Sequence, residues 1–167
     1  MLKNFLKNHL FELIFLLFIF LLDRISKIYI IHLDKISKTS EIYISKFLNI
    51  HLIWNEGIAF GFFSFQKINL YNFLTFIIII VIFIIVFMTF KSKGFKKYSF
   101  LMILGGALGN VIDRMIYKAV PDFIDFHIGE FHWFIFNIAD VFISLGIIFM
   151  IFLELIDNNE TNKVKKI

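Results

Sequence analysis

The 167-residue chain contains no cysteine, a single proline and few charged side chains, which make up 18% of the sequence. Without cysteine there is no disulfide framework, no cysteine-ligated zinc site and no thiol nucleophile. The chain is instead 59% hydrophobic and contains 25 phenylalanines, whereas ordinary soluble domains are about 45–50% apolar. This composition excludes a disordered chain or a coiled coil and predicts a single integral membrane domain over residues 1–167.

Long apolar runs predict four membrane-spanning helices. A bilayer core about 30 Å thick requires about 20 apolar residues, and the run 68–90 contains no charge. Short β-prone runs between the spans, such as Phe47–Ile50 and Phe123–Trp133, predict a small sheet. We therefore expect an all-α membrane protein with four transmembrane helices and a small extracytoplasmic β-containing region. The expected spans are about 10–33, 68–90, 98–117 and 134–155, with extracytoplasmic loops at about 34–67 and 118–133.

The lysines predict the orientation of these spans. Four crossings place both termini on one side, and the positive-inside rule makes the lysine-rich side cytoplasmic. No small-residue cleavage site follows the first apolar run, so we expect a retained helix. The net charge of +4 does not indicate nucleic acid, because the lysines lie between apolar runs, and membrane lipid is the expected partner. The nine lysines on the cytoplasmic side are Lys3, Lys7, Lys91, Lys93, Lys96, Lys97, Lys163, Lys165 and Lys166.

Ionisable side chains inside the spans are the first functional signal. Each costs at least about 2.5–3.5 kcal/mol on insertion scales near the bilayer centre. Asp23 and Lys27 are four residues apart, so they share a helix face and can pair. A self-neutralising pair with no function explains this feature equally well. We interpret Arg24 as an interfacial charge that extends its guanidinium to water.

Two further segments combine small and amide residues. Trp54–Phe63 alternates small or amide residues with large ones, which is typical of a re-entrant loop near a ligand, although a plain glycine turn explains it as well. In the third span, Gly105 and Gly109 have the small-xxx-small spacing of close helix contacts. Asn110, Asp113 and Arg114 follow on one side of that helix. An Asp113–Arg114 pair at the interface is one explanation, but packing alone requires neither that pair nor Asn110.

Two acids flank the start of the fourth span. Asn137 is a good helix N-cap, and Asp140 lies in the first turn, where the helix dipole favours an anion. Capping does not explain the second acid, Asp122, at the same membrane depth. Two carboxylates within hydrogen-bond reach share a proton, so one can activate water while the other polarises a carbonyl. Such a pair hydrolyses peptide bonds without a metal or cofactor.

Competing chemistries have weaker support in the sequence. The histidines, at positions 9, 32, 51, 127 and 132, have no HExxH spacing and are divided between the two membrane sides, so we expect no metal site. A small transporter that uses Asp23, Lys27, Asp113 and Asp140 as a relay is the alternative, although these groups cluster toward one face. A purely structural scaffold has no use for so many embedded polar groups.

Four blocks of the sequence together resemble the lipoprotein signal peptidases (signal peptidase II) of bacteria. The resemblance covers nearly the whole chain, and the order and spacing of the blocks agree. Pro121 is a local departure between Val120 and Asp122; it removes a backbone donor but leaves the acid in place. The blocks are Asp23–Lys27, Trp54–Phe60, Gly105–Arg114 followed by Val120–Phe126, and Phe136–Asp140.

The resemblance implies an intramembrane aspartic endopeptidase with Asp122 and Asp140 as its catalytic dyad. The enzyme would remove the signal peptide of diacylglyceryl-modified prolipoproteins, cutting before the lipidated cysteine, with no cofactor. It would act as a monomer in the bacterial inner membrane, near the extracytoplasmic face. Asp113, expected to be held by Arg114, stays the alternative first acid. The residues expected to bind substrate or support the site are Asp23, Lys27, Asn55, Gly57, Ala59, Gly105, Gly109, Asn110, Asp113, Arg114, Val120, Asn137 and Ala139.

Overall fold

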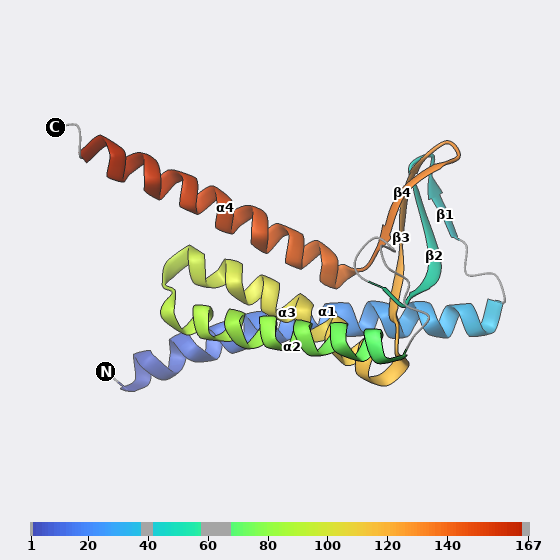
Figure 1. Cartoon of the computed structure of the whole chain (residues 1–167), viewed down its shortest axis with the longest axis horizontal. Coiled ribbons are helices and arrows are strands. Elements are labelled where there is room, and N and C mark those ends of the chain that lie inside the picture. The colour runs from blue at the N-terminus through green and yellow to red at the C-terminus, as the bar shows by residue number, and fades with distance from the viewer. Residues whose placement is uncertain (1, 38–41, 58–67, 165–167) are drawn as a thin grey trace.

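The computed structural model describes residues 2–37, 42–57 and 68–164. Successive helices run in opposite directions along the long axis, and a small sheet lies at one end (Figure 1). The beginning of α1 and the end of α4 lie at the opposite end from the sheet. The helices are α1 (Leu2–Ser37), α2 (Ile68–Lys91), α3 (Gly94–Tyr117) and α4 (Ile138–Val164), and the strands are β1 (Ile42–Ser45), β2 (Leu48–Asn55), β3 (Val120–Ile128) and β4 (Phe131–Phe136).

Three helical segments in the described part of the chain are long and apolar enough to cross a membrane: Tyr71–Lys91, Gly94–Tyr117 and Ile138–Asp157. Helix α1 has 36 residues, ample for a span, but Asp23, Arg24 and Lys27 interrupt its apolar run. The described structure is therefore mostly helical, with three candidate spans and a small antiparallel sheet.

Helix α3 is the central helix of the bundle. In its most apolar stretch 67% of residues are buried, against 17% for α2 and 11% for α4. Glycines let the neighbouring helices approach it closely. A Cβ on Gly105 would contact Ile19 of α1, and one on Gly106 would collide with the backbone carbonyl of Ala139 on α4. On the outer helices large apolar side chains such as Phe83 remain exposed, as expected for a surface that faces lipid.

The sheet predicted for the loops is confirmed. Its strands follow the order β1-β2-β3-β4 with antiparallel pairing throughout. Gly129, at a φ of +61°, provides the left-handed residue of the turn between β3 and β4. Helix α4 begins at Ile138, not near residue 134 as predicted. The aromatic run at 131–136 pairs with β3 instead of extending the helix.

The sheet packs on the end of α1 through a small apolar cluster. Ile30 of α1, Leu52 of β2 and Phe123 of β3 are all buried together. Burying one such side chain contributes about 1.5–3 kcal/mol. The cluster holds β3 against the helices, and Asp122 precedes Phe123 on that strand. The side chain of Asp122 is thereby held close to the ends of α3 and α4.

Candidate active site

A cavity of about 230 Å³ lies where the sheet meets α3 and α4. Two acids from different elements line it, Asp122 from β3 and Asp140 from the first turn of α4. Part of its wall is apolar, so charges in it are poorly hydrated. The cavity is lined by Asn55, Ile78, Ala107, Asn110, Arg114, Val120, Asp122, Asp140 and Ile143.

The Asp122 carboxylate is 3% exposed and accepts a hydrogen bond at each oxygen. The side-chain amide of Asn137 donates to Oδ1, and that of Asn55 donates to Oδ2 over 2.8 Å. Burial, followed by the negative charge of Asp140, raises the pKa of Asp122 to about 7, while the two amide donors act in the opposite direction. At neutral pH this carboxyl therefore takes up and releases a proton readily, as a general acid or base requires.

Asp140 is held by the helix that carries it and by α3. Asn110 donates from Nδ2 to Oδ1 of Asp140 over 2.8 Å, and the backbone N–H of Asn137 donates to Oδ2 over 3.2 Å. In return, Oδ1 of Asn137 accepts from the backbone N–H of Asp140 over 3.1 Å. This reciprocal pair is a capping box at the start of α4, and it confirms Asn137 as the predicted N-cap.

All three asparagines present the same end of their amide to the acids. An amide accepts only through its oxygen and donates only through its nitrogen. In each residue a donor occupies the oxygen: the N–H of Gly57 for Asn55 at 2.9 Å, and Nζ of Lys27 for Asn110 at 2.7 Å. For Asn137 that donor is the N–H of Asp140. The nitrogens are consequently directed at the two carboxylates, which sit among fixed donors.

A buried lysine connects this site to α1. Lys27 is 1% exposed, and besides Asn110 its ammonium donates to Asp23 over 2.9 Å and to Asp113 over 2.8 Å. The Asp23–Lys27 pairing predicted from their spacing is thus present. The other oxygen of Asp23 accepts the backbone N–H of Ala139 over 3.0 Å. A continuous chain of hydrogen bonds therefore joins α1, α3 and the start of α4.

Two predicted roles of arginines are wrong. Arg24 does not extend to water; it donates to Asp113 over 2.6 Å and to Asp23 over 3.3 Å. Asp113 is accordingly held by Arg24 and Lys27, not by Arg114. Successive helix residues point in different directions, so Arg114 faces away from its neighbour. It donates to the backbone carbonyl of Gly57 over 2.8 Å.

The remaining predicted site residues fall into three groups. Val120 lines the cavity, whereas Ala139 is fully buried and does not line it. Gly105 and Gly109 do not line the cavity; they admit Ile19 and Asp23 of α1 against α3. Ala59 lies outside the described residues. Sequence reasoning missed the apolar wall of Ile78, Ala107 and Ile143, since nothing distinguishes these residues from others in the apolar runs.

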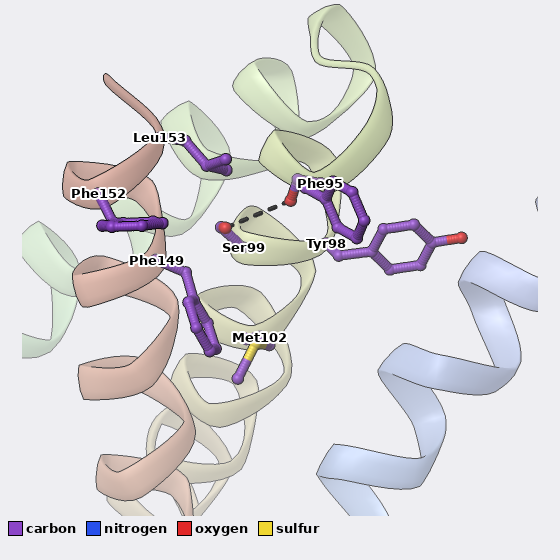
Figure 2. A pocket seen from close by; sticks show the side chains of 7 residues that line it. All are labelled: Phe95, Tyr98, Ser99, Met102, Phe149, Phe152 and Leu153. Carbon is purple, nitrogen blue, oxygen red and sulfur yellow. Dashed lines mark hydrogen bonds between the residues drawn. The ribbon is translucent and has the colours of Figure 1, made fainter. Parts of the chain in front are cut away.

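A larger hollow of about 510 Å³ lies between α3 and α4 at the end away from the sheet (Figure 2). No acidic side chain among the described residues lines it, and the hydroxyl of Ser99 donates to the carbonyl of Phe95. The hollow therefore offers no pair of acids that could hydrolyse a peptide bond. The hollow is lined by Phe95, Tyr98, Ser99, Met102, Phe149, Phe152 and Leu153.

Comparisons with known proteins agree with this arrangement. The family model for signal peptidase (SPase) II matches residues 15–156. A lipoprotein signal peptidase of Pelagibacter ubique (strain HTCC1062) is 46% identical over 160 residues, covering 96% of both chains. One from Burkholderia mallei (strain SAVP1) is 39% identical over 115 residues, 67% of this chain and 69% of that one. A solved bacterial membrane enzyme superposes with a TM-score of 0.76 at 31% identity, covering 89% of this chain and 90% of the other.

Proposed function

The chain belongs to the signal peptidase II family, and we propose that it is an aspartic endopeptidase with Asp122 and Asp140 as its catalytic dyad. It removes the signal peptide from diacylglyceryl-modified prolipoproteins by cutting before the lipidated cysteine. The observation that supports this most directly is the shared cavity, in which two acids face one space while every carboxylate oxygen accepts a fixed donor.

The mechanism uses one proton shared between the two acids. The ionised carboxylate removes a proton from water, and the water oxygen attacks the carbonyl carbon of the scissile peptide bond. The protonated acid donates to the carbonyl oxygen, which gives a neutral tetrahedral intermediate. Collapse breaks the C–N bond as the leaving nitrogen takes up a proton, and both acids return to their starting states. A pKa of about 7 for Asp122 suits the protonated partner at neutral pH.

The surrounding polar residues position the acids and the substrate. Asn55, Asn110 and Asn137 keep both carboxylates in place, so little reorganisation is needed during reaction. Arg114 lines the cavity, and its Nε and Nη1 have no hydrogen-bond partner within the described residues. These donors are suited to the carbonyl groups of an extended substrate backbone. All of these groups come from one copy of the chain, so a monomer suffices.

Helix α1 serves as the first of four membrane spans. Its charged groups do not face lipid as isolated ions, because Asp23 and Lys27 are buried and paired, and Arg24 pairs with Asp113. Pairing removes most of the cost that keeps charges out of membranes. Four spans place both termini on the lysine-rich side, the cytoplasm. The sheet and the acids then lie at the extracytoplasmic face of the inner membrane, within reach of translocated lipoproteins.

The transporter alternative has less support. Of the described residues, the buried ionisable groups lie in the sheet or at the sheet end of the bundle, and Asp140 of the cavity lies beside them. The buried groups are Asp23, Lys27, Asp113, Arg114, Asp122, Asp125 and His127. A relay across the bilayer requires such groups through its full depth. The central part of α2 contributes none.

Cleavage of a lipidated proprotein by the purified full-length enzyme tests the proposal. Asp122→Asn and Asp140→Asn should each abolish cleavage while the protein stays folded by thermal unfolding. Glu154→Gln, at an exposed acid near the far end of α4, is the control and should cleave normally. Full activity in either aspartate variant would overturn the dyad, and proton flux in liposomes without proteolysis would favour the transporter.

A further inference from the structure

Three potential metal ligands converge on the sheet, away from the cavity. Asp125 and His127 are two residues apart on β3, so their side chains emerge on the same face. His132 on β4 is the register partner of His127. One ligand atom from each of the three side chains lies within 4.8 Å of the other two.

The convergence is buried on one side and open on the other. Asp125 is 2% exposed and His127 8%, whereas the His132 side chain is 52% exposed. Nδ1 of His132 lies 2.8 Å and 2.9 Å from the two Asp125 oxygens. Nδ1 of His127 lies 3.8 Å from the same carboxylate. An ion could therefore reach the carboxylate from solvent by way of His132.

Two buried polar atoms on this face of the sheet have no hydrogen-bond partner within the described residues. One is Nδ1 of His127, and the other is the side-chain carbonyl oxygen of Asn49. Asn49 on β2 is the register partner of Asp125, so the two side chains lie on the same face of the sheet. Buried polar atoms are normally hydrogen-bonded. A nitrogen and an oxygen without hydrogen bonds beside a carboxylate indicate a bound metal cation, which would accept electron pairs from all three groups.

We propose that Asp125, His127 and His132 bind one Zn²⁺ ion, with Asn49 or solvent in the fourth position. Zinc binds imidazole nitrogen and carboxylate oxygen at about 2.0–2.2 Å, with tetrahedral geometry in structural sites. This differs from the metal-free expectation from sequence, which rested on the absence of HExxH spacing and on the division of the histidines between the two membrane sides. Here the spacing is that of a hairpin, where i and i+2 on one strand meet a residue across the turn.

The ion would join β3 to β4 at a useful position. Asp122 lies three residues before Asp125 on the same strand, so a clamp at Asp125 also restrains the strand that carries a cavity acid. The zinc would be structural, because its ligands do not line the cavity. Its binding should raise the thermal stability of the native protein, since an ion that binds only the folded state shifts the unfolding equilibrium.

Equilibrium dialysis of the full-length protein against Zn²⁺ tests the proposal. The protein should carry no histidine tag and should first be stripped with a chelator. We expect about one zinc per chain, with affinity weakened about tenfold or more in Asp125→Asn and in His132→Gln. His9→Gln, at an exposed histidine on α1, is the control and should bind as the native protein does. No binding below about 100 μM zinc, or equal binding by all four proteins, would overturn the site.

Two further measurements keep the test decisive if a variant fails to fold. The native protein loaded with Co²⁺ should show the intense visible absorption of a tetrahedral nitrogen–oxygen site, and a weak octahedral spectrum would refute it. Zn²⁺ should raise the unfolding temperature of the native protein and of His9→Gln, and an unchanged temperature would count against the site. Both readouts are independent of proteolysis, so their failure would leave the proposed function standing.

Discussion

Lys27 on α1 donates a hydrogen bond to the side-chain oxygen of Asn110 on α3 over 2.7 Å. This contact decides which end of the Asn110 amide faces the cavity, because the oxygen is occupied and the nitrogen must turn to Asp140. Lys27 never touches the cavity acids, yet it orients a group that does. We therefore expect this one buried ammonium to affect both stability and activity.

Replacing Lys27 by Met should destabilise the protein strongly. The substitution leaves the buried Asp23 and Asp113 carboxylates with only Arg24 as a cationic partner. Removing one member of a buried ion pair costs about 3–5 kcal/mol. Lys96→Met is the matched control, because its partner Glu154 is exposed, and it should change stability by less than about 1 kcal/mol. Denaturant unfolding in detergent measures both, and similar losses in the two variants would contradict the buried network.

Asn137 should show separate effects on stability and activity. Asn137→Ala loses the helix cap, at about 1 kcal/mol, together with the donor to Asp122. Asn137→Ser keeps a capping oxygen, but its shorter side chain has no amide donor to Asp122. We expect both variants to lose cleavage activity, and the alanine variant to lose more stability than the serine variant, because it loses the cap as well as the donor. Thermal unfolding and cleavage rates on the same preparations test this, and normal cleavage by the serine variant would mean that the cap alone matters.

Asp122 should make stability fall as the pH rises. Its pKa is about 7 in the folded protein against an ordinary value of 3.8. The folded state therefore holds the proton more tightly, and the resulting stabilisation is complete below about pH 4 and lost as the pH rises through about 7. Asp122→Asn should show a flatter profile over this window. Denaturant unfolding at a series of pH values makes the comparison, and identical profiles would refute the raised pKa.

The pH dependence of cleavage should follow the same group. If the dyad needs one proton, kcat/KM falls as the pH rises above about 7. Asn55 donates to Asp122 and so lowers its pKa. Asn55→Ala should therefore move the fall in kcat/KM, the alkaline limb of the pH profile, to higher pH, in addition to slowing cleavage. A limb that moves to lower pH would contradict the assignment.

Gly106 and Gly109 should tolerate no larger residue. A Cβ on Gly106 would collide with the backbone carbonyl of Ala139, and one on Gly109 with the pinned carboxylate of Asp23. Overpacking of this kind costs about 1–3 kcal/mol. Met115→Ala, on the exposed surface of the same helix, should have little effect. The unfolding temperatures of Gly106→Ala, Gly109→Ala and Met115→Ala test this prediction. An unchanged unfolding temperature for Gly106→Ala would mean that α4 can move away from α3.

Local patterns in the sequence predicted those features that depend on near neighbours in the chain. The spacing of Asp23 and Lys27 predicted their pairing, and Asn137 was recognised as a cap from its place before an apolar run. The β-prone runs predicted the sheet. The start of α4 was placed too early, because an apolar aromatic run of six residues is compatible with strand or helix until its pairing partner is known.

Partners across helices were harder to predict. Arg114 follows Asp113 directly, yet the acid is held by Arg24 and Lys27 from a helix some 90 residues away. The pairing of charged side chains on α1 and α3 depends on how each helix is rotated about its axis. That rotation depends on where the glycines of α3 allow α1 to approach closely. The convergence of Asp125, His127 and His132 likewise depends on the strand register.

By itself the sequence predicted the membrane character, the order of helices and strands, and the two acids that we propose perform hydrolysis. These follow from hydrophobicity and from residue spacing, which act over a few turns of chain. Only the tertiary structure decided that Asp122 and Asp140 line one cavity, and that three asparagines present their nitrogens to them. Such arrangements depend on the close packing of elements distant in sequence, where a shift of one residue in register or a small rotation of a helix changes every partner.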